Sequence, residues 1–352
     1  MLRSYESDTV EEPGIEKYLD SFLETTAGTN NETDDTLFRR VLCCESSRSL
    51  YCQRCCRLLV PDHLVPAPIS HRTKEYYGGG NTTSIEHSGV RQLTLPFKLH
   101  IILDDRRGSA TGLHAVVLMN GTDGILSTKN DSNDITEDCD VPSFSDSSES
   151  GSVKLVDLAT DEMPKYRGCD DSTYLLFPSP GESVPLEMVA SMVNTLVVLD
   201  CKWTKSKLCR TDEELSSLRK VHLSSPPEKS YYWRWHNAGP GMLSTIEAIY
   251  YAAVEVTRVK HKYLSDAGLI SQSDSRKDVN NLIHLLWLFG HQRAATFRSA
   301  QHAGILAPCT DEGKELQREM RKQKGTWRQL RHKEDERRLN ERMTLKIRNN
   351  EA

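Results

Sequence analysis

The chain has 352 residues, a formal net charge of −5 and a mean hydropathy of −0.55. This length accommodates one large domain or two small ones, and the low hydropathy indicates that part of the chain stays outside a packed core. The charge argues against a protein that binds nucleic acid over its whole surface, and the longest strongly apolar stretch, residues 282–290, is too short to span a bilayer.

The first segment, residues 1–36, is acidic. The first 40 residues contain ten Asp or Glu and four Lys or Arg, without an apolar signal core. We therefore expect a disordered acidic leader and an intracellular protein, in the nucleus, the cytoplasm or both. In those compartments the ten cysteines are expected to be thiols or metal ligands and not disulfides.

Residues 37–68 contain a cysteine cluster and predict a small cysteine-containing subdomain. Cys52 and Cys55 form a CxxC pair, whereas Cys43 and Cys44 are adjacent upstream. These four side chains could hold zinc, although adjacent cysteines strain a shared tetrahedral site. The alternative is a set of thiols in a loop-rich segment.

Residues 69–308 alternate short apolar segments with longer amphipathic ones. Three segments predict strands: 95–105, 173–180 and 194–200. Four segments predict helices, in whole or in part: 110–119, 182–193, 243–264 and 278–304. The alternation predicts an α/β domain with a mostly parallel sheet and flanking helices. Residues 127–152 are polar, acidic and of low complexity, so we expect an unstructured insertion within this domain.

The last segment, residues 309–352, is basic. Residues 314–348 contain thirteen Lys or Arg and six Asp or Glu, with few apolar side chains. We expect a helical tail. Its charge suits a solvated helix, a nuclear-import signal or an extension that binds RNA.

Strand ends predict the position of a ligand site. Asp104, Pro178 and Asp200 each follow a predicted strand. Ligands of parallel α/β sheets bind beyond the carboxyl ends of the strands, so these residues are expected on one rim. An isolated Asp200 and Trp203 would be typical of a turn cap and a core residue.

Two further segments could have either a structural or a ligand-binding role. Ser244 and Glu247 have the spacing of a capping box, and the same helix N-terminus could bind an anion. Arg234 lies between Trp233 and Trp235, which suits a phosphate or carboxylate beside a stacked ring, and equally a plain surface strand.

The order of these pieces resembles the DTW-domain family, most closely its eukaryotic branch. The pieces are a strand ending LLFPSP, then LD-x-x-W-T, an aromatic–Arg segment and LSTIEAIYYA. The resemblance spans roughly residues 40–300 without the insertion. The family signature is Asp-x-Thr-Trp, and here Lys202 stands in the place of the Thr. A cation two residues from Asp200 is expected to lower the pKa of that carboxyl.

The resemblance implies a fold and a reaction. The fold would be SPOUT-like α/β, with a trefoil knot as one option. The reaction would transfer the 3-amino-3-carboxypropyl group of S-adenosylmethionine to N3 of a tRNA D-loop uridine, leaving methylthioadenosine. An RNA methyltransferase of the same superfamily and a non-catalytic RNA-binding member are the alternatives.

The resemblance also implies the site. Asp200 and Trp203 would be catalytic, with Asp200 as the base or the neighbour of the sulfonium, and tRNA would be the partner. The residues expected to bind the donor are Phe177, Pro178, Ser179, Leu199, Arg234, Ser244 and Thr245.

Overall fold

The computed structural model describes residues 14–24, 50–54, 56–60, 65–70, 93–119, 151–168, 171–202, 207–233, 242–304, 306–307 and 310–323, and four single positions beyond them. The predicted insertion 127–152, apart from its last two residues, and most of the cysteine subdomain and basic tail lie outside these residues. The chain forms two compact units, Met1–Ser230 with Ala238–Gln292, and Tyr231–Asn237 with Arg293–Ala352.

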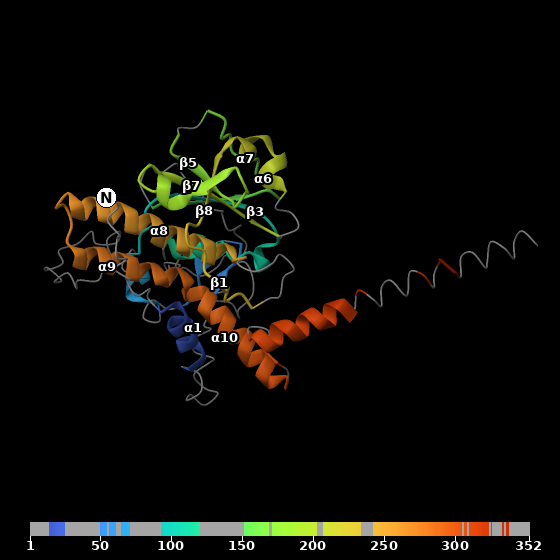
Figure 1. Ribbon diagram of the computed structural model, residues 1–352. Coiled ribbons are helices and arrows are strands. Elements are labelled where there is room, and N and C mark those ends of the chain that lie inside the picture. The colour runs from blue at the N-terminus through green and yellow to red at the C-terminus, as the bar shows by residue number, and fades with distance from the viewer. Residues whose placement is uncertain are drawn as a thin grey trace, which may run out of the picture. The chain divides into compact units, whose positions relative to one another are not determined.

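The first unit is built on a sheet of six strands (Figure 1). In spatial order they are β4 (Val153–Asp157), β3 (Lys98–Asp104), β7 (Thr195–Cys201), β5 (Thr173–Leu176), β8 (Arg219–His222) and β6 (Ser183–Pro185). Every neighbouring pair is parallel. This arrangement confirms the predicted α/β fold with a parallel sheet. The SPOUT-like topology and the knot stay predictions.

Three neighbouring strands of the sheet were predicted, and the other three were not. β3 and β5 fall within the predicted segments and β7 extends one residue beyond its segment, to Cys201, whereas β4, β8 and β6 are additional. The helix predicted over 182–193 is wrong in its first part, since β6 occupies residues 183–185 and α5 (Leu186–Val189) is a single turn. β4 and β6 are edge strands that pair on one side only.

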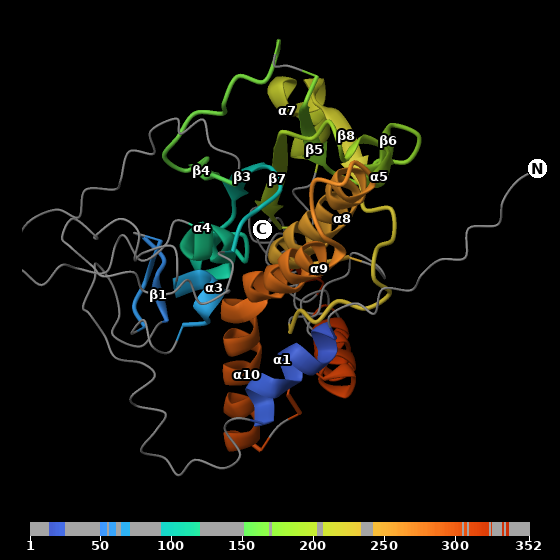
Figure 2. The same cartoon turned by 90° about the vertical axis from the view of Figure 1, so that its left-hand side faces the viewer.

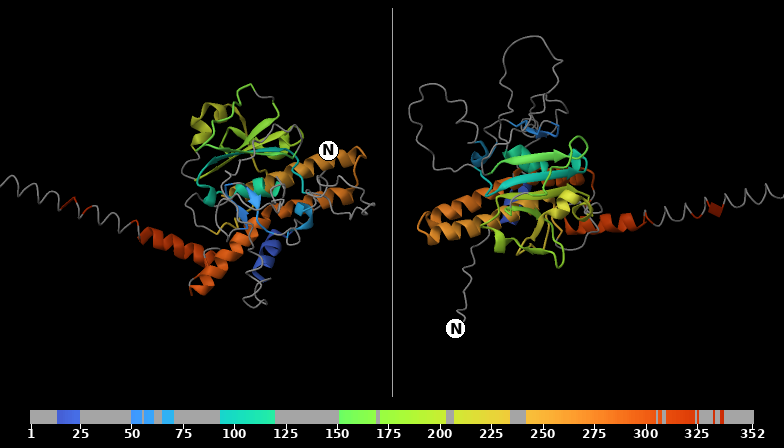
Figure 3. Two further views of the ribbon diagram at one scale, coloured as in Figure 1. Left: turned by 180° about the vertical axis from the view of Figure 1, so that it is seen from behind. Right: turned by 90° about the horizontal axis from the view of Figure 1, so that it is seen from above.

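Helices cover both faces of the sheet (Figures 1 and 3). On one face, α6 (Leu208–Thr211) and α7 (Glu213–Ser217) pack on side chains that alternate along the strands. Members of this core cluster are Ile102, Leu175, Val197, Cys209 and Leu215. On the other face lie α4 (Leu113–Met119), which Figure 2 shows beneath β3 and β4, and α8 (Thr245–Asp266). The carboxyl ends of the strands therefore meet at one edge of a three-layer unit, which we call the carboxyl edge.

The two predicted long helices are present, but the second is divided into several elements. α8 begins at Thr245 with Ser244 as its N-cap, as the capping box predicted. The segment predicted as one helix over 278–304 contains the end of α9 (Gln272–Asn281), a 3₁₀ helix, η5 (Leu282–Leu286), and α10 (Trp287–His302). Within the described residues, no helix has the length and apolar character needed to cross a membrane.

The predicted disordered leader contains a helix, so that part of the prediction is wrong. α1 (Ile15–Glu24) buries Ile15 and Leu19, and the Tyr18 hydroxyl lies 3.3 Å from Nδ1 of His284. The spacing of Ile15, Leu19 and Phe22 places apolar side chains on one helix face. Burial of this apolar stripe stabilises the helix although the segment as a whole is acidic.

The second unit includes a helix over residues 311–323. Its acidic and basic residues are equal in number, and Arg318–Glu315 (3.4 Å) and Lys322–Glu319 (2.6 Å) form ion pairs one turn apart. The excess positive charge of the tail therefore resides in the residues that follow this helix.

Candidate active site at the carboxyl edge

Asp200 lies at the end of β7 and connects three segments. Its Oδ2 accepts a hydrogen bond from the backbone N–H of Gly112 at 2.6 Å, and its Oδ1 accepts one from the Thr245 hydroxyl at 2.9 Å. The residue is 6% exposed. A single carboxylate thus links the strand end to the segment before α4 and to the first residue of α8.

Gly112 is required by this close approach. A Cβ at position 112 would lie 2.7 Å from Oδ2 of Asp200, and 3.1 Å from a methyl group of Ile101. Contacts under 3.0 Å force atoms to move, so any larger residue would displace either the carboxylate or the backbone.

The environment of Asp200 raises the pKa of its carboxyl group from 3.8 to about 6. Burial is the main cause and repulsion from Asp105 adds to it, while the hydrogen bonds from Gly112 and Thr245 act in the opposite direction. The expectation that Lys202 lowers this pKa is wrong. β7 ends at Cys201, and the Lys202 side chain is 61% exposed, with Nζ 3.9 Å from Oδ1 of Asp105.

The start of α8 is fixed by a second carboxylate. Glu247 Oε2 accepts hydrogen bonds from the backbone N–H of Ser244 at 2.8 Å, the Ser244 hydroxyl at 2.7 Å and the Ser230 hydroxyl at 2.8 Å. The N–H of Ile246 donates to the Thr111 hydroxyl at 3.3 Å. The helix N-terminus predicted as a possible anion site therefore already has two carboxylates of the protein beside it: Glu247, which accepts from the Ser244 N–H, and Asp200, which accepts from the Thr245 hydroxyl.

The predicted donor-binding residues fall on two faces of the sheet. Phe177 and Leu199 are half-buried and pack on the core cluster beneath α6 and α7. Asp200 and Thr245 lie on the α8 face. Both groups nevertheless lie at the carboxyl edge, since Phe177 follows β5 and Leu199 and Asp200 lie near the end of its neighbour β7.

Pro178 and Ser179 follow β5 at this edge. Ser179 is buried, and its hydroxyl donates to Glu182 at 2.9 Å. Its backbone N–H donates to the Ser183 hydroxyl at 3.1 Å, which lies 3.0 Å from Nδ1 of His222. These contacts fix the turn between β5 and β6.

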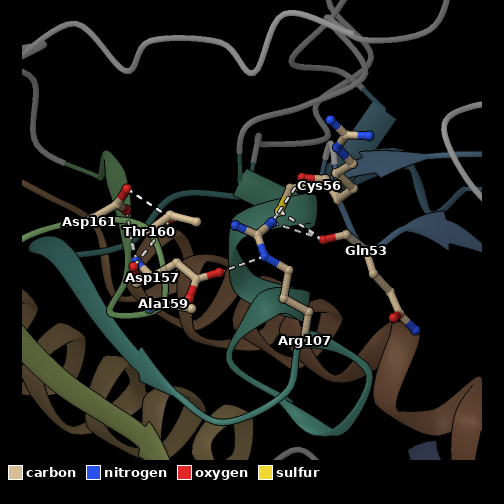
Figure 4. A network of polar contacts seen from close by, with 8 residues as sticks. Gln53, Cys56, Arg107, Asp157, Ala159, Thr160 and Asp161 are labelled. Carbon is tan, nitrogen blue, oxygen red and sulfur yellow. Dashed lines mark hydrogen bonds and ion pairs between the residues drawn. The ribbon is translucent and has the colours of Figure 1, made fainter. Parts of the chain in front are cut away.

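Sequence reasoning missed an arginine network at the same edge (Figure 4). Arg107 Nε donates to Oδ2 of Asp157, at the end of β4, at 2.8 Å. Its Nη1 donates to the backbone carbonyls of Gln53 at 3.1 Å and Arg54 at 2.9 Å, and lies 4.0 Å from Sγ of Cys56. Arg107 thus attaches the cysteine turn to the sheet. Its place three residues after β3 was the one available signal.

Several predicted site residues lie outside the described residues, namely Trp203, Arg234, Cys43, Cys44 and Cys55. Cys52 is buried in β1 (Tyr51–Cys52), and burial raises the pKa of the nearby Cys56 thiol to about 11. Among the described residues, no group of three His, Cys, Asp or Glu side chains could hold a metal ion. The zinc site stays a prediction.

Comparison with known proteins bears on the family. Residues 134–267 match the family model described as DTW domain. This range contains β4 to β8 and the whole of α8, so it includes Asp200 and Thr245 but not Gly112. The match confirms the predicted resemblance to the DTW-domain family, over a shorter range than expected.

Two individual proteins are similar to the chain. The tRNA-uridine aminocarboxypropyltransferase 1 of Xenopus tropicalis is 25% identical over 234 residues, which cover 60% of this chain and 68% of that protein. The solved structure of the SAM-dependent rRNA:acp-transferase Tsr3 from Vulcanisaeta distributa matches with a TM-score of 0.28 at 18% identity, covering 56% of this chain and 100% of that one.

Gly112→Ala is expected to lower the free energy of unfolding by about 1–3 kcal/mol, because its Cβ would overlap the Asp200 carboxylate. Chemical denaturation of the variant and the parent measures the difference. Gly14→Ala is the control, since its added Cβ would lie 3.5 Å from the Lys17 Cβ, an ordinary contact. Equal effects of the two substitutions would contradict the requirement for glycine at 112.

Asp200 predicts a pH dependence of stability. Its folded-state pKa of about 6 exceeds the ordinary 3.8, so its contribution to stability is full below about pH 4 and is lost as pH rises through 6. Asn at 200 can still accept from Gly112 and donate to the Thr245 oxygen. The unfolding free energy of the parent minus that of Asp200→Asn should therefore fall between pH 4 and 6 and level off above 7. A flat difference would show that the carboxyl titrates normally.

Proposed function

We propose that this protein transfers the 3-amino-3-carboxypropyl group of S-adenosylmethionine to N3 of a uridine in the D-loop of tRNA, forming 3-(3-amino-3-carboxypropyl)uridine. The observation that carries the proposal is the DTW-domain match over residues 134–267, which contains a buried, titratable carboxylate at the carboxyl edge. The similar Xenopus tropicalis protein, named as a tRNA-uridine aminocarboxypropyltransferase, supports the reaction class.

The charges at the carboxyl edge fit a cationic donor. Burial is the main cause of the raised pKa of both Asp200 and the Cys201 thiol. Asp105 raises the pKa of Asp200 further, and Cys209, Asp200, Asp104 and Asp105 raise that of Cys201 further. Negative charge is therefore concentrated at the ends of β3 and β7, and a positive charge placed there is attracted by it and relieves the repulsion between Asp105 and Asp200. A sulfonium and an α-ammonium, the two cations of S-adenosylmethionine, have that charge.

Asp200 has the properties of the base that the reaction needs. When bound, the donor supplies a carbon activated by its sulfonium, and the uridine must lose its N3 proton to attack it. A pKa of about 6 leaves the carboxylate ionised at neutral pH and a stronger base than an ordinary Asp. Gly112 and Thr245 each occupy one lone pair of Asp200, so each oxygen retains a second one.

The remaining predicted residues keep positioning roles in this proposal. Phe177, Pro178 and Ser179 at the end of β5 would form one wall of the donor site, and Ser244 with Thr245 would form another. Trp203 would stack against a ring, and Arg234 would bind the donor carboxylate or a phosphate. All of these residues fall within the range 134–267 that matches the DTW-domain model, which supports these assignments.

The direct test uses the full chain, unmodified tRNA and S-adenosylmethionine labelled in the aminocarboxypropyl group. We expect the label in tRNA, methylthioadenosine as the co-product, and a modified uridine in the nucleoside mass spectrum. Label in the methyl group of the donor serves as the control. A methylated nucleoside would replace the proposal by a methyltransferase, and donor binding without product would indicate a non-catalytic RNA-binding protein.

Asp200→Asn should reduce turnover by about a hundredfold to ten-thousandfold while the protein stays folded, because a general base contributes that much. Thr245→Val removes a hydrogen bond that favours the ionised carboxylate, so the pH at which kcat/KM reaches its plateau should rise. Thr257→Val, within α8, is the matched control and should leave that pH unchanged. Normal turnover of Asp200→Asn would limit Asp200 to a structural role.

A further inference from the structure

Charges of opposite sign are separated by depth at the carboxyl edge. Carboxylates that follow the strands are largely covered, with side chains 10% exposed at Asp157 and 13% exposed at Asp105, and with Asp200 6% exposed. Asp161 is an exposed exception, and its carboxylate accepts hydrogen bonds from the Asp157 N–H at 2.9 Å and the Thr160 hydroxyl at 3.0 Å. Four cations of this edge, in contrast, are exposed, whereas Arg107 is half-buried.

One exposed cation accompanies each of four neighbouring strand ends. Arg106 follows β3 and Lys202 follows β7. Arg54 is on the cysteine turn that Arg107 attaches to the end of β4, and Arg210 of α6 lies with its guanidinium carbon 6.0 Å from the centre of the Phe177 ring, beyond β5. All four are exposed. We call Arg54, Arg106, Lys202 and Arg210 the cation row.

The order of the strands sets the order of the row. β4, β3, β7 and β5 are successive neighbours in the sheet. Since adjacent strands lie about 4.8 Å apart, the four strand ends span about 14 Å. The positive charges are therefore spread along a line and not gathered at one point, which suits a chain of phosphates better than a single phosphate group.

The row is poorly neutralised by the protein. Lys202 has one carboxylate near it, that of Asp105, at 3.9 Å. No carboxylate of a described residue lies within 4.0 Å of the other three side chains. Cations left in this state attract a polyanion and release its counterions on binding.

Arg107 positions one end of the row. Its guanidinium donates to the carbonyls of Gln53 and Arg54 and to the carboxylate of Asp157, so the turn that carries Arg54 is fixed to the sheet (Figure 4). The Arg107 side chain is itself only 28% exposed. It is a positioning residue, whereas Arg54 offers its guanidinium to solvent.

We propose that the cation row binds the phosphate backbone of the RNA substrate and sets its path across the carboxyl edge. This proposal rests on the proposed function for the identity of the RNA as tRNA, and it adds the surface that holds it. The RNA would run along the ends of β4, β3, β7 and β5, above the carboxylates assigned to the cationic donor.

The test compares two triple variants of the full chain. The first, Arg106→Gln, Lys202→Gln and Arg210→Gln, removes three cations of the row. The second, Lys262→Gln, Arg276→Gln and Lys277→Gln, removes three exposed cations of α8 and α9. The sets match closely, because Lys277, like Lys202, has one carboxylate at 3.9 Å. Lys262 is about 25 Å along α8 from Thr245, at 1.5 Å per residue.

The measurement is the Kd for unmodified tRNA over a range of salt concentrations, with thermal unfolding as a check on folding. We expect the first triple variant to raise Kd on the order of tenfold to a hundredfold near 0.1 M salt, and to reduce the slope of log K against log salt by about 2 to 3. The second triple variant should keep the slope of the parent. Arg107→Met should reproduce part of the loss through Arg54 alone, reducing the slope by about 1.

Two outcomes separate this proposal from the proposed function. A parent that binds and modifies tRNA while the first triple variant binds with unchanged Kd and slope would overturn the cation row and leave the activity standing. Charge-dependent tRNA binding through the row, with no modified nucleoside, would support the row and overturn the activity. Equal losses from both triple variants would show that only net charge matters and would also overturn the row.

Discussion

The carboxylate of Asp200 is the contact on which the carboxyl edge depends. It joins a strand end to Gly112, 88 residues earlier, and to Thr245, 45 residues later. Because it accepts from both, the segment before α4 and the first turn of α8 are held at a fixed position relative to β7. The position at the N-terminus of a 22-residue helix also places a negative charge where the helix dipole favours one.

This contact is costly in a way that points to chemistry. Burial raises the pKa of Asp200 to about 6, so at neutral pH the protein keeps an ionised carboxylate where a neutral side chain would be more favourable. An asparagine could make both hydrogen bonds without that cost. A titratable group that is retained under strong desolvation, beside a second carboxylate at the end of a parallel strand, has the features of a functional group more than of a structural one. Gly112 is needed for the same carboxylate, since only a residue without a Cβ lets the backbone N–H come close enough to donate to Asp200.

The sequence was sufficient to predict what depends on local pattern. β3, β5 and β7 are central strands with apolar runs, and α8 carries both an apolar stripe and the capping box of Ser244 and Glu247. β4, β8 and β6 were missed because their sequences, VKLVD, RKVH and SVP, are short and their apolar residues are interrupted by charged residues or proline. α1 was missed for the opposite reason, since the acidic composition of the leader concealed a short apolar stripe.

Other parts of the site could not be read from the sequence in principle. Two of the acceptors of Arg107 are backbone carbonyls, which every residue has, and its third is a carboxylate 50 residues away. Lys202 is two residues from Asp200 in the chain, yet its ammonium lies near Asp105, because the strand ends between them and the chain changes direction. In both cases the distance along the chain is a poor guide to which charges are close. The arrangement of neighbouring strands determines these contacts instead.

The separation of charge by depth explains how a chain with net charge −5 could handle two oppositely charged substrates at one edge. A cationic donor is stabilised by carboxylates that are covered and therefore weakly screened, whereas RNA meets cations that extend into solvent. The two sets do not cancel, because Asp157 and Asp200 are occupied by Arg107, Gly112 and Thr245, leaving Arg54, Arg106 and Arg210 exposed. Net charge averages over the acidic segments elsewhere in the chain and so carries no information about this edge. The local arrangement of strand ends is what makes an acidic protein compatible with a polyanionic substrate.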